Sequence, residues 1–90
     1  MKKQAHVYYS GHVQGIGFRY TLADIAKQHN VAGWVKNLED SRVEVVAEAD
    51  EEALKSFLQE ASQYFFREIK EASVEWLPAS GEFREFSIKF

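Results

Sequence analysis

The sequence predicts an α+β sandwich in which two helices cover one face of an antiparallel sheet. Two segments place apolar residues at helical spacing, and the segments between them alternate apolar and polar residues as half-buried strands do. Their order is strand, helix, strand, strand, helix, strand, followed by a C-terminal strand. Two strand–helix–strand halves in this order are typical of the ferredoxin-like fold.

The first strand–helix–strand half is predicted within residues 4–38. Alternating apolar residues indicate a strand over 4–10, and a glycine-rich stretch follows it. A helical pattern begins at about Phe18 and ends near Asn30, a residue type that suits a C-terminal cap. The second strand is predicted over 31–38.

The second half begins after a short turn at 39–41. Residues 42–49 alternate cleanly and predict a strand that forms a hairpin with its predecessor. Asp50 suits an N-cap, and the helix after it buries a stripe of apolar residues. Residues 63–71 keep no clear period and remain unassigned. Further strands are expected around Val74 and Ile88.

Length and composition predict one domain spanning residues 1–90. The chain is 46% hydrophobic and 14% aromatic, which is enough for one packed core. It has no cysteine, which excludes disulfides, thiolate metal sites and a cysteine nucleophile. No apolar run is long enough for a membrane span or a signal peptide, so we expect a cytoplasmic protein that does not bind membranes.

The segment Ser10–Arg19 contains three glycines and ends in an arginine. Glycine loops let successive backbone N–H groups point into one concavity, and the N-terminus of a following helix adds further donors. No Ser, Thr, Asp or Asn caps these donors, and the Arg19 guanidinium matches a phosphate in bidentate fashion. From spacing alone, an anion site and a simple tight turn remain equally open. The segment matches neither a P-loop nor a dinucleotide fingerprint.

The residues of this segment are more specific than their spacing. Gly11-His12-Val13-Gln14-Gly15-Ile16-Gly17-Phe18-Arg19 resembles the acylphosphatase signature Gly-x-Val-Gln-Gly-Val-Gly-Phe-Arg, and Gly33-Trp34-Val35-Lys36-Asn37 resembles the second signature of that family. The resemblance covers nearly the whole chain. It implies hydrolysis of a small-molecule acyl phosphate to a carboxylate and inorganic phosphate.

The resemblance also implies roles for individual residues. Arg19 and Asn37 would be catalytic: the matching arginine binds the phosphoryl group, and the matching asparagine positions the attacking water. The backbone of Gln14, Gly15, Ile16, Gly17 and Phe18 would hold the phosphate. The residues alone leave simpler alternatives open, namely a surface salt bridge for Arg19 and a hydrogen bond from Asn37 to the neighbouring turn.

The reaction itself needs few groups. An acyl phosphate is a mixed anhydride whose carboxylate leaving group is already a weak base, so no strong general acid is required, and phosphoryl transfer is mostly positioning and charge stabilisation. We expect no cofactor. The three histidines, His6, His12 and His29, show no ligand spacing, and we expect no metal site.

Net charge also bears on partners. Residues 1–36 carry a net charge of +4 and residues 37–90 a net charge of −7, for −3 in total. An acidic balance argues against a nucleic-acid surface. We expect a monomer. Two alternatives stay open: a carbamoyl-phosphate-binding domain like that of a much longer hydrogenase-maturation protein, and a non-catalytic ferredoxin-like module.

The chain departs from the family pattern in three places. Ser41 stands in the hairpin turn where a glycine is usual, and Ala49 replaces another glycine at the end of the third strand. The Gly-Pro-rich connection after the second helix is replaced by Gln63–Glu68. A serine adopts positive φ at a higher cost than glycine, so we expect either Asp40 to adopt it or the turn type to differ.

Overall fold

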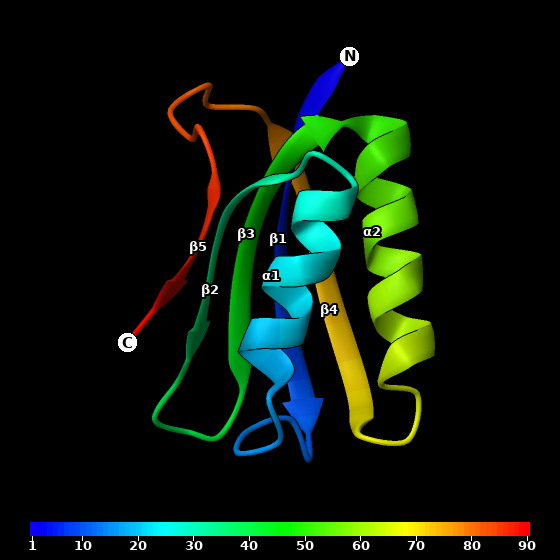
Figure 1. Ribbon diagram of the computed structural model, residues 1–90, viewed down its shortest axis with the longest axis vertical. Helices are drawn as coiled ribbons and strands as arrows, with labels where there is room; N and C mark the ends of the chain where they lie inside the picture. Colours follow the sequence, from blue (N-terminus) through cyan, green and yellow to red (C-terminus); the bar gives the residue numbers. More distant parts are fainter.

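A computed structural model describes residues 1–90 as a five-stranded sheet with two helices packed against one face (Figure 1). The fold class predicted from the sequence is thereby confirmed. The elements in chain order are β1 (Lys2–Gly11), α1 (Phe18–Gln28), β2 (Ala32–Asn37), β3 (Val43–Asp50), α2 (Glu51–Tyr64), β4 (Ile69–Pro78) and β5 (Phe86–Lys89).

The strand order in the sheet is β4-β1-β3-β2-β5. The first four strands pair antiparallel, as predicted, whereas β5 pairs parallel to β2, so the complete sheet is mixed. The parallel pairing arises because the chain leaves β4 at one edge of the sheet and crosses its end to reach the opposite edge. Such a crossing brings the C-terminal strand beside β2 and under α1.

The core lies between the helices and the sheet. Ala5, Val7 and Tyr9 of β1 face the helices and are almost fully buried, opposite Val45 and Ala47 of the neighbouring β3. The other face of the sheet carries polar side chains, as the alternation predicted. Burial of one apolar face on each element is the main force that fixes the register, because a slip of one residue would turn that face to solvent.

The ends of the helices show how local sequence sets the boundaries. Asn30 adopts φ 56°, and the N–H of Val31 donates to the carbonyl of Ala26 at 2.8 Å, so α1 ends in a Schellman-type cap. Asp50 occupies the N-cap of α2 as predicted, but its side chain makes no capping hydrogen bond. Its carboxylate instead lies 3.7 Å from the N-terminal amine.

The structure accommodates all three departures from the family pattern. Ser41 itself adopts positive φ, at 74°, and Asp40 does not, so our expectation that Asp40 would take this conformation was wrong. Residues 63–68 complete α2 and form a tight turn, in which the ring of Phe65 packs 4.4 Å from that of Phe18. Ala49 is buried within β3.

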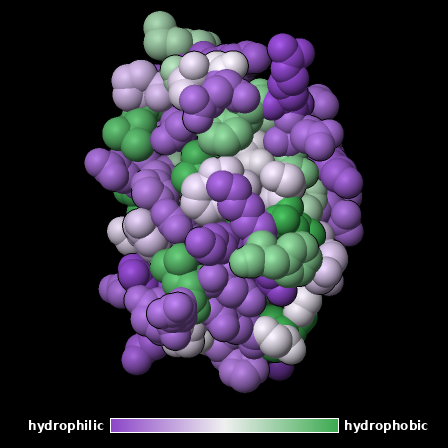
Figure 2. All heavy atoms as spheres, turned by 90° about the vertical axis from the view of Figure 1, so that its left-hand side faces the viewer, coloured by the Kyte–Doolittle hydropathy of each residue, from purple (hydrophilic) through white to green (hydrophobic).

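Apolar groups are exposed at the edge strand β4 and on the side of the molecule that carries β5. Trp76 of β4 is 42% exposed, because β4 is an edge strand that neither helix covers fully. On the side that carries β5, hydrophobic groups form small patches among hydrophilic ones (Figure 2). Neither helix has the length and apolar character needed to cross a membrane.

Candidate active site

The loop between β1 and α1 has the backbone that its glycines predict. Gly15 and Gly17 take φ values of 78° and 81°, in the left-handed region that other residues avoid. Gly17 is the N-cap of α1 and makes no side-chain cap, and the first helical hydrogen bond is donated by Thr21 to Gly17. The first turn of α1 therefore presents uncapped N–H groups, where a helix attracts anions.

A small cavity of about 70 Å³ lies at this turn. A cavity of this size has room for a small group of a few heavy atoms, such as a phosphoryl group. Arg19 and Asn37, which come from α1 and the end of β2, both line it. The complete lining is Val13, Gly15, Gly17, Phe18, Arg19, Tyr20 and Asn37.

Arg19 is held by the C-terminal residues. Its Nη1 donates to the carbonyl of Lys89 at 3.2 Å, and its Cζ lies 4.9 Å from the centre of the Phe90 ring. No carboxylate lies within ion-pair distance of Arg19, so the alternative of a surface salt bridge is wrong. The guanidinium charge is left without a protein counterion beside the cavity.

Asn37 is the last residue of β2 and pairs with Val43 of β3. Its side chain makes no hydrogen bond to the turn at 39–41, which removes the alternative role considered for it. The strand that carries it is fixed by Gly33, where a Cβ would lie only 1.9 Å from the Val46 carbonyl oxygen. Only glycine permits that close approach, so the Gly33–Asn37 signature acts partly through packing.

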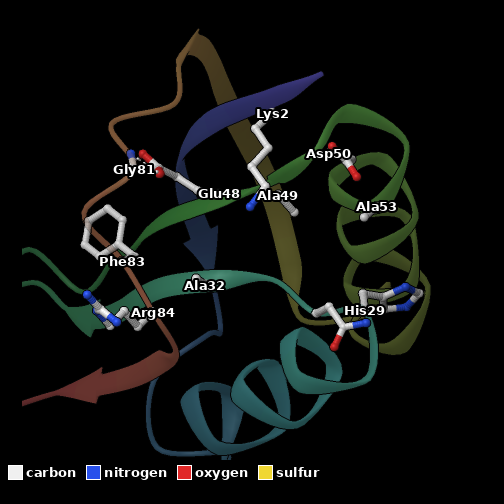
Figure 3. A pocket seen from close by; sticks show the side chains of 11 residues that line it. Lys2, His29, Ala32, Glu48, Ala49, Asp50, Ala53, Gly81, Phe83 and Arg84 are labelled. Carbon is white, nitrogen blue, oxygen red and sulfur yellow. Dashed lines mark hydrogen bonds between the residues drawn. The ribbon is translucent and has the colours of Figure 1, made fainter.

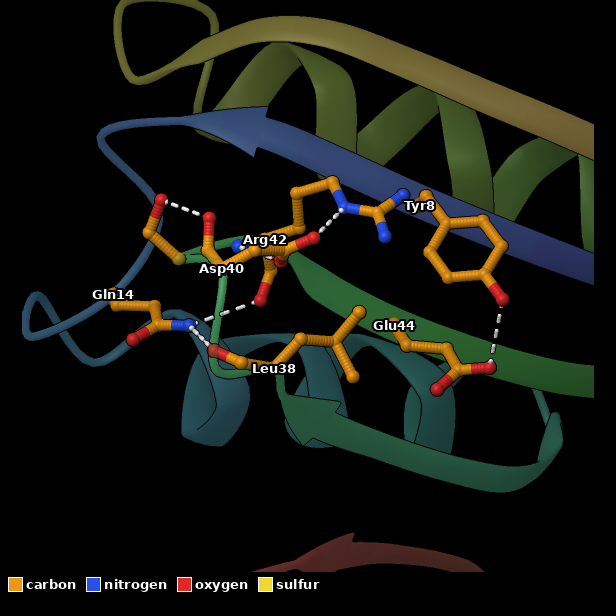
Figure 4. Close-up of polar contacts among 7 residues, drawn as sticks. Tyr8, Gln14, Leu38, Asp40, Arg42 and Glu44 are labelled. Carbon is orange, nitrogen blue, oxygen red and sulfur yellow. Dashed lines mark hydrogen bonds and ion pairs between the residues drawn. The ribbon is translucent and has the colours of Figure 1, made fainter.

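Gln14 has a role that the sequence did not predict. Its side-chain amide nitrogen donates to the carbonyls of Leu38 at 2.8 Å and of Arg42 at 2.9 Å, at the base of the β2–β3 turn (Figure 4). The glycine loop is thus tied to the chain immediately after Asn37. No local signal could have revealed this contact, because it joins residues 24 and 28 positions apart.

The predicted phosphate-binding segment is therefore only partly gathered around the cavity. Gly15, Gly17 and Phe18 line it, whereas Gln14 and Ile16 do not. Gln14 turns towards the β2–β3 turn, and Ile16 is 36% exposed.

A larger cavity, of about 420 Å³, lies at the opposite end of the sheet, where β1 begins and α1 ends (Figure 3). It contains none of the predicted site residues. Glu48 on its wall is only 7% exposed and accepts hydrogen bonds from the Ser80 and Gly81 amides and from Gln4. Burial would raise the pKa of Glu48, but these hydrogen bonds outweigh it and hold the pKa below its ordinary value.

The histidines lie apart from one another. His6 Nε2 is 2.6 Å from Glu44, on the face of the sheet away from the helices, and His29 Nε2 is 2.8 Å from Glu60 of α2. His12 is in the glycine loop. No three His, Asp or Glu side chains are grouped so that they could hold a metal ion.

The chain is similar to known proteins over nearly its whole length. The acylphosphatase family profile matches residues 5–88. An acylphosphatase of Bacillus velezensis is 41% identical over 88 residues, which are 97% of this chain and 98% of that protein. The crystal structure of the Bacillus subtilis acylphosphatase superimposes with a TM-score of 0.91 at 37% identity, covering 98% of this chain and 99% of that one.

A longer protein contains a similar unit. A crystal structure of full-length HypF in a phosphate- and nucleotide-bound form matches all of this chain with a TM-score of 0.86 at 25% identity, but the match covers only 12% of HypF. The family profile, the near full-length relative and the shared fold agree. This chain belongs to the acylphosphatase family.

Proposed function

We propose that this chain hydrolyses acyl phosphates at the small cavity, with the phosphoryl group held by the loop of residues 14–18 and Arg19, and with the attacking water positioned by Asn37. The observation that carries the proposal is that Arg19, Asn37 and the uncapped first turn of α1 line the same cavity of about 70 Å³. We also propose that the reaction needs no metal and no cofactor.

Arg19 supplies the charge. The equatorial oxygens of a transferring phosphoryl group carry distributed negative charge, and the enzyme accelerates transfer by placing fixed donors around them. Arg19 has no carboxylate partner, and its contacts with the Lys89 carbonyl and the Phe90 ring restrict its motion. A restrained, unneutralised guanidinium stabilises such oxygens with little reorganisation.

Asn37 supplies orientation without removing a proton. A carboxamide offers two N–H donors and one carbonyl acceptor, so it can hold a water in a fixed direction. Its side chain is free of protein partners and borders the cavity. The water would attack phosphorus in line with the departing carboxylate, which is a weak base and leaves without a general acid. The substrate's own phosphoryl oxygen would receive the water's proton.

Two alternatives remain for test. One is the carbamoyl-phosphate-binding domain of a longer protein that the sequence left open, and the match to 12% of HypF, whose crystal structure contains phosphate and nucleotide, keeps it open. A non-catalytic module would bind phosphate without turnover. We further propose that the chain works as a monomer in the cytoplasm, which sedimentation and cell fractionation would check; the lack of cysteine suits that compartment.

The test is hydrolysis of benzoyl phosphate in the presence of EDTA, with wild type and Arg19→Ala compared directly. We expect turnover by wild type and a loss of roughly 10²-fold or more in kcat/KM for the variant, the size typical of losing one transition-state donor. A folded wild type that shows no turnover would refute the proposal. Turnover only after a divalent metal is restored would refute metal independence.

A further inference from the structure

We infer that the acyl group of the substrate lies on an apolar rim formed by Ile16, Tyr20 and Phe90, and that this rim makes the enzyme prefer acyl phosphates with an extended apolar acyl group. The inference rests on the proposed function, since it concerns the part of the same substrate that leaves. It gives the side chains of Ile16 and Tyr20 a role outside the phosphate chemistry, and gives Phe90 a second role besides its contact with Arg19.

The size of the cavity requires that the acyl group lie outside it. We take the cavity, of about 70 Å³, to hold the phosphoryl group and its water. In an in-line reaction the leaving carboxylate points away from the attacking water, so the acyl group extends from the mouth on the side away from Asn37. The surface at the mouth therefore decides which acyl groups gain binding energy.

Three exposed apolar side chains belong to, or adjoin, residues that line the cavity. Tyr20 borders the cavity and is 58% exposed, Ile16 lies in sequence between Gly15 and Gly17, which both border it, and Phe90 is 86% exposed against the guanidinium of Arg19, which also borders it. Figure 2 shows that hydrophobic side chains on the side carrying β5 form small patches among hydrophilic ones. Large apolar side chains this exposed at one site are typical of a binding surface.

The chemistry of the rim excludes a strongly polar acyl group as the favoured ligand. Tyr20 offers one hydroxyl, and Ile16 and Phe90 offer no polar side-chain atom at all. An alkyl or aromatic acyl group gains from leaving water for this surface. Because the contact persists as the carboxylate departs, the gain appears in kcat/KM for the long substrate and not in the phosphate affinity.

The test compares acetyl phosphate with hexanoyl phosphate. Their carboxylate leaving groups have nearly equal basicity, so the ratio of kcat/KM values reports acyl binding and not intrinsic reactivity. We expect kcat/KM of wild type to be about 5-fold higher for hexanoyl phosphate than for acetyl phosphate. This is less than the 10-fold or more that one methylene contributes in a closed pocket, because the rim is open to solvent. Tyr20→Ala should lower that ratio to near one, and Tyr20→Phe should keep it.

The matched control is Tyr64→Ala. Tyr64 is also on a helix and 64% exposed, but it does not border the cavity, so the ratio should stay at the wild-type value. Equal kcat/KM values for both substrates in wild type, or a ratio that Tyr20→Ala leaves unchanged, would overturn the inference about the rim. Neither result would contradict the proposed hydrolysis. Failure of wild type to hydrolyse either substrate would instead overturn the proposed function.

Discussion

The side-chain amide of Gln14 donates a hydrogen bond of 2.8 Å to the backbone carbonyl of Leu38, and so links the glycine loop to the residue that follows Asn37. A second hydrogen bond, to the Arg42 carbonyl, closes the base of the β2–β3 turn on the same amide. Two halves of the site that come from distant parts of the chain are thereby held in one relative position, which phosphoryl transfer requires.

Gln14→Met keeps most of the side-chain volume and removes both hydrogen bonds. We expect kcat for benzoyl phosphate to fall by about 10-fold, because small misplacements of positioning groups carry large rate penalties. The free energy of unfolding should fall by about 1–3 kcal/mol, the sum for two such bonds. Steady-state kinetics and urea denaturation would measure the two effects, and an unchanged kcat would show that the link is only structural.

Asn37→Ala should depress kcat by about 10²-fold while changing the inhibition constant of inorganic phosphate by less than about 3-fold. The reason is that the amide acts on the water and not on the phosphate, so its contribution appears only in the transition state. Initial rates with phosphate as a competitive inhibitor would separate the two quantities. Equal losses in kcat and in phosphate affinity would contradict the role of Asn37 in positioning water.

Phe90→Ala removes the ring beside the Arg19 guanidinium. An exposed cation–π contact is worth about 0.5–1 kcal/mol, so we expect phosphate to inhibit the variant about 2- to 5-fold less tightly. Phe66→Ala is a matched control, because Phe66 is similarly exposed and lies 5.4 Å from Arg67, away from the cavity. A similar change in both variants would indicate a general effect of removing a surface ring.

Glu48→Gln should destabilise the protein at pH 7 by about 1–2 kcal/mol, because two backbone amides lose a charged acceptor. Since the folded-state pKa of Glu48 lies below the unfolded one, its stabilisation is present above about pH 4.3 and is lost as the pH falls through the folded value. The two proteins should therefore converge in stability as the solution is acidified. Denaturation curves at pH 7 and pH 3 would measure this, with the exposed Glu71→Gln as control.

Ser41→Gly should stabilise the protein by about 0.5–1 kcal/mol, because glycine removes the cost of a side chain at φ 74°. The greater flexibility of glycine in the unfolded chain cancels part of this stabilisation. For a chain of this size we expect the melting temperature to rise by a few degrees. Ser62→Gly within α2 is the opposite control and should lower it. A lower melting temperature for Ser41→Gly would mean that the serine hydroxyl matters more than the backbone strain.

Local sequence patterns were sufficient for most of the fold. The alternation around Val7 and Val45 and the helical spacing after Phe18 and Asp50 predicted the strands and helices, because each element shows its buried face in its own residues. The segment at 63–71 could not be assigned, because its neighbouring aromatic residues differ in burial and follow no helical or strand period. Phe65 fills the core beside Phe18, whereas Phe66 is exposed.

The sequence by itself determined the fold class, the glycine loop with its uncapped helix start, and the residues Arg19 and Asn37 as candidates. Only the tertiary structure decided that these two side chains border one cavity, that Arg19 has the C-terminal residues and no carboxylate as its neighbours, and that β5 runs parallel to β2. The physical reason is the separation of the interacting residues along the sequence. Backbone conformation and one-sided burial are set by neighbours in sequence, whereas the Gln14–Leu38 and Arg19–Lys89 contacts arise only when the packed core brings distant segments together.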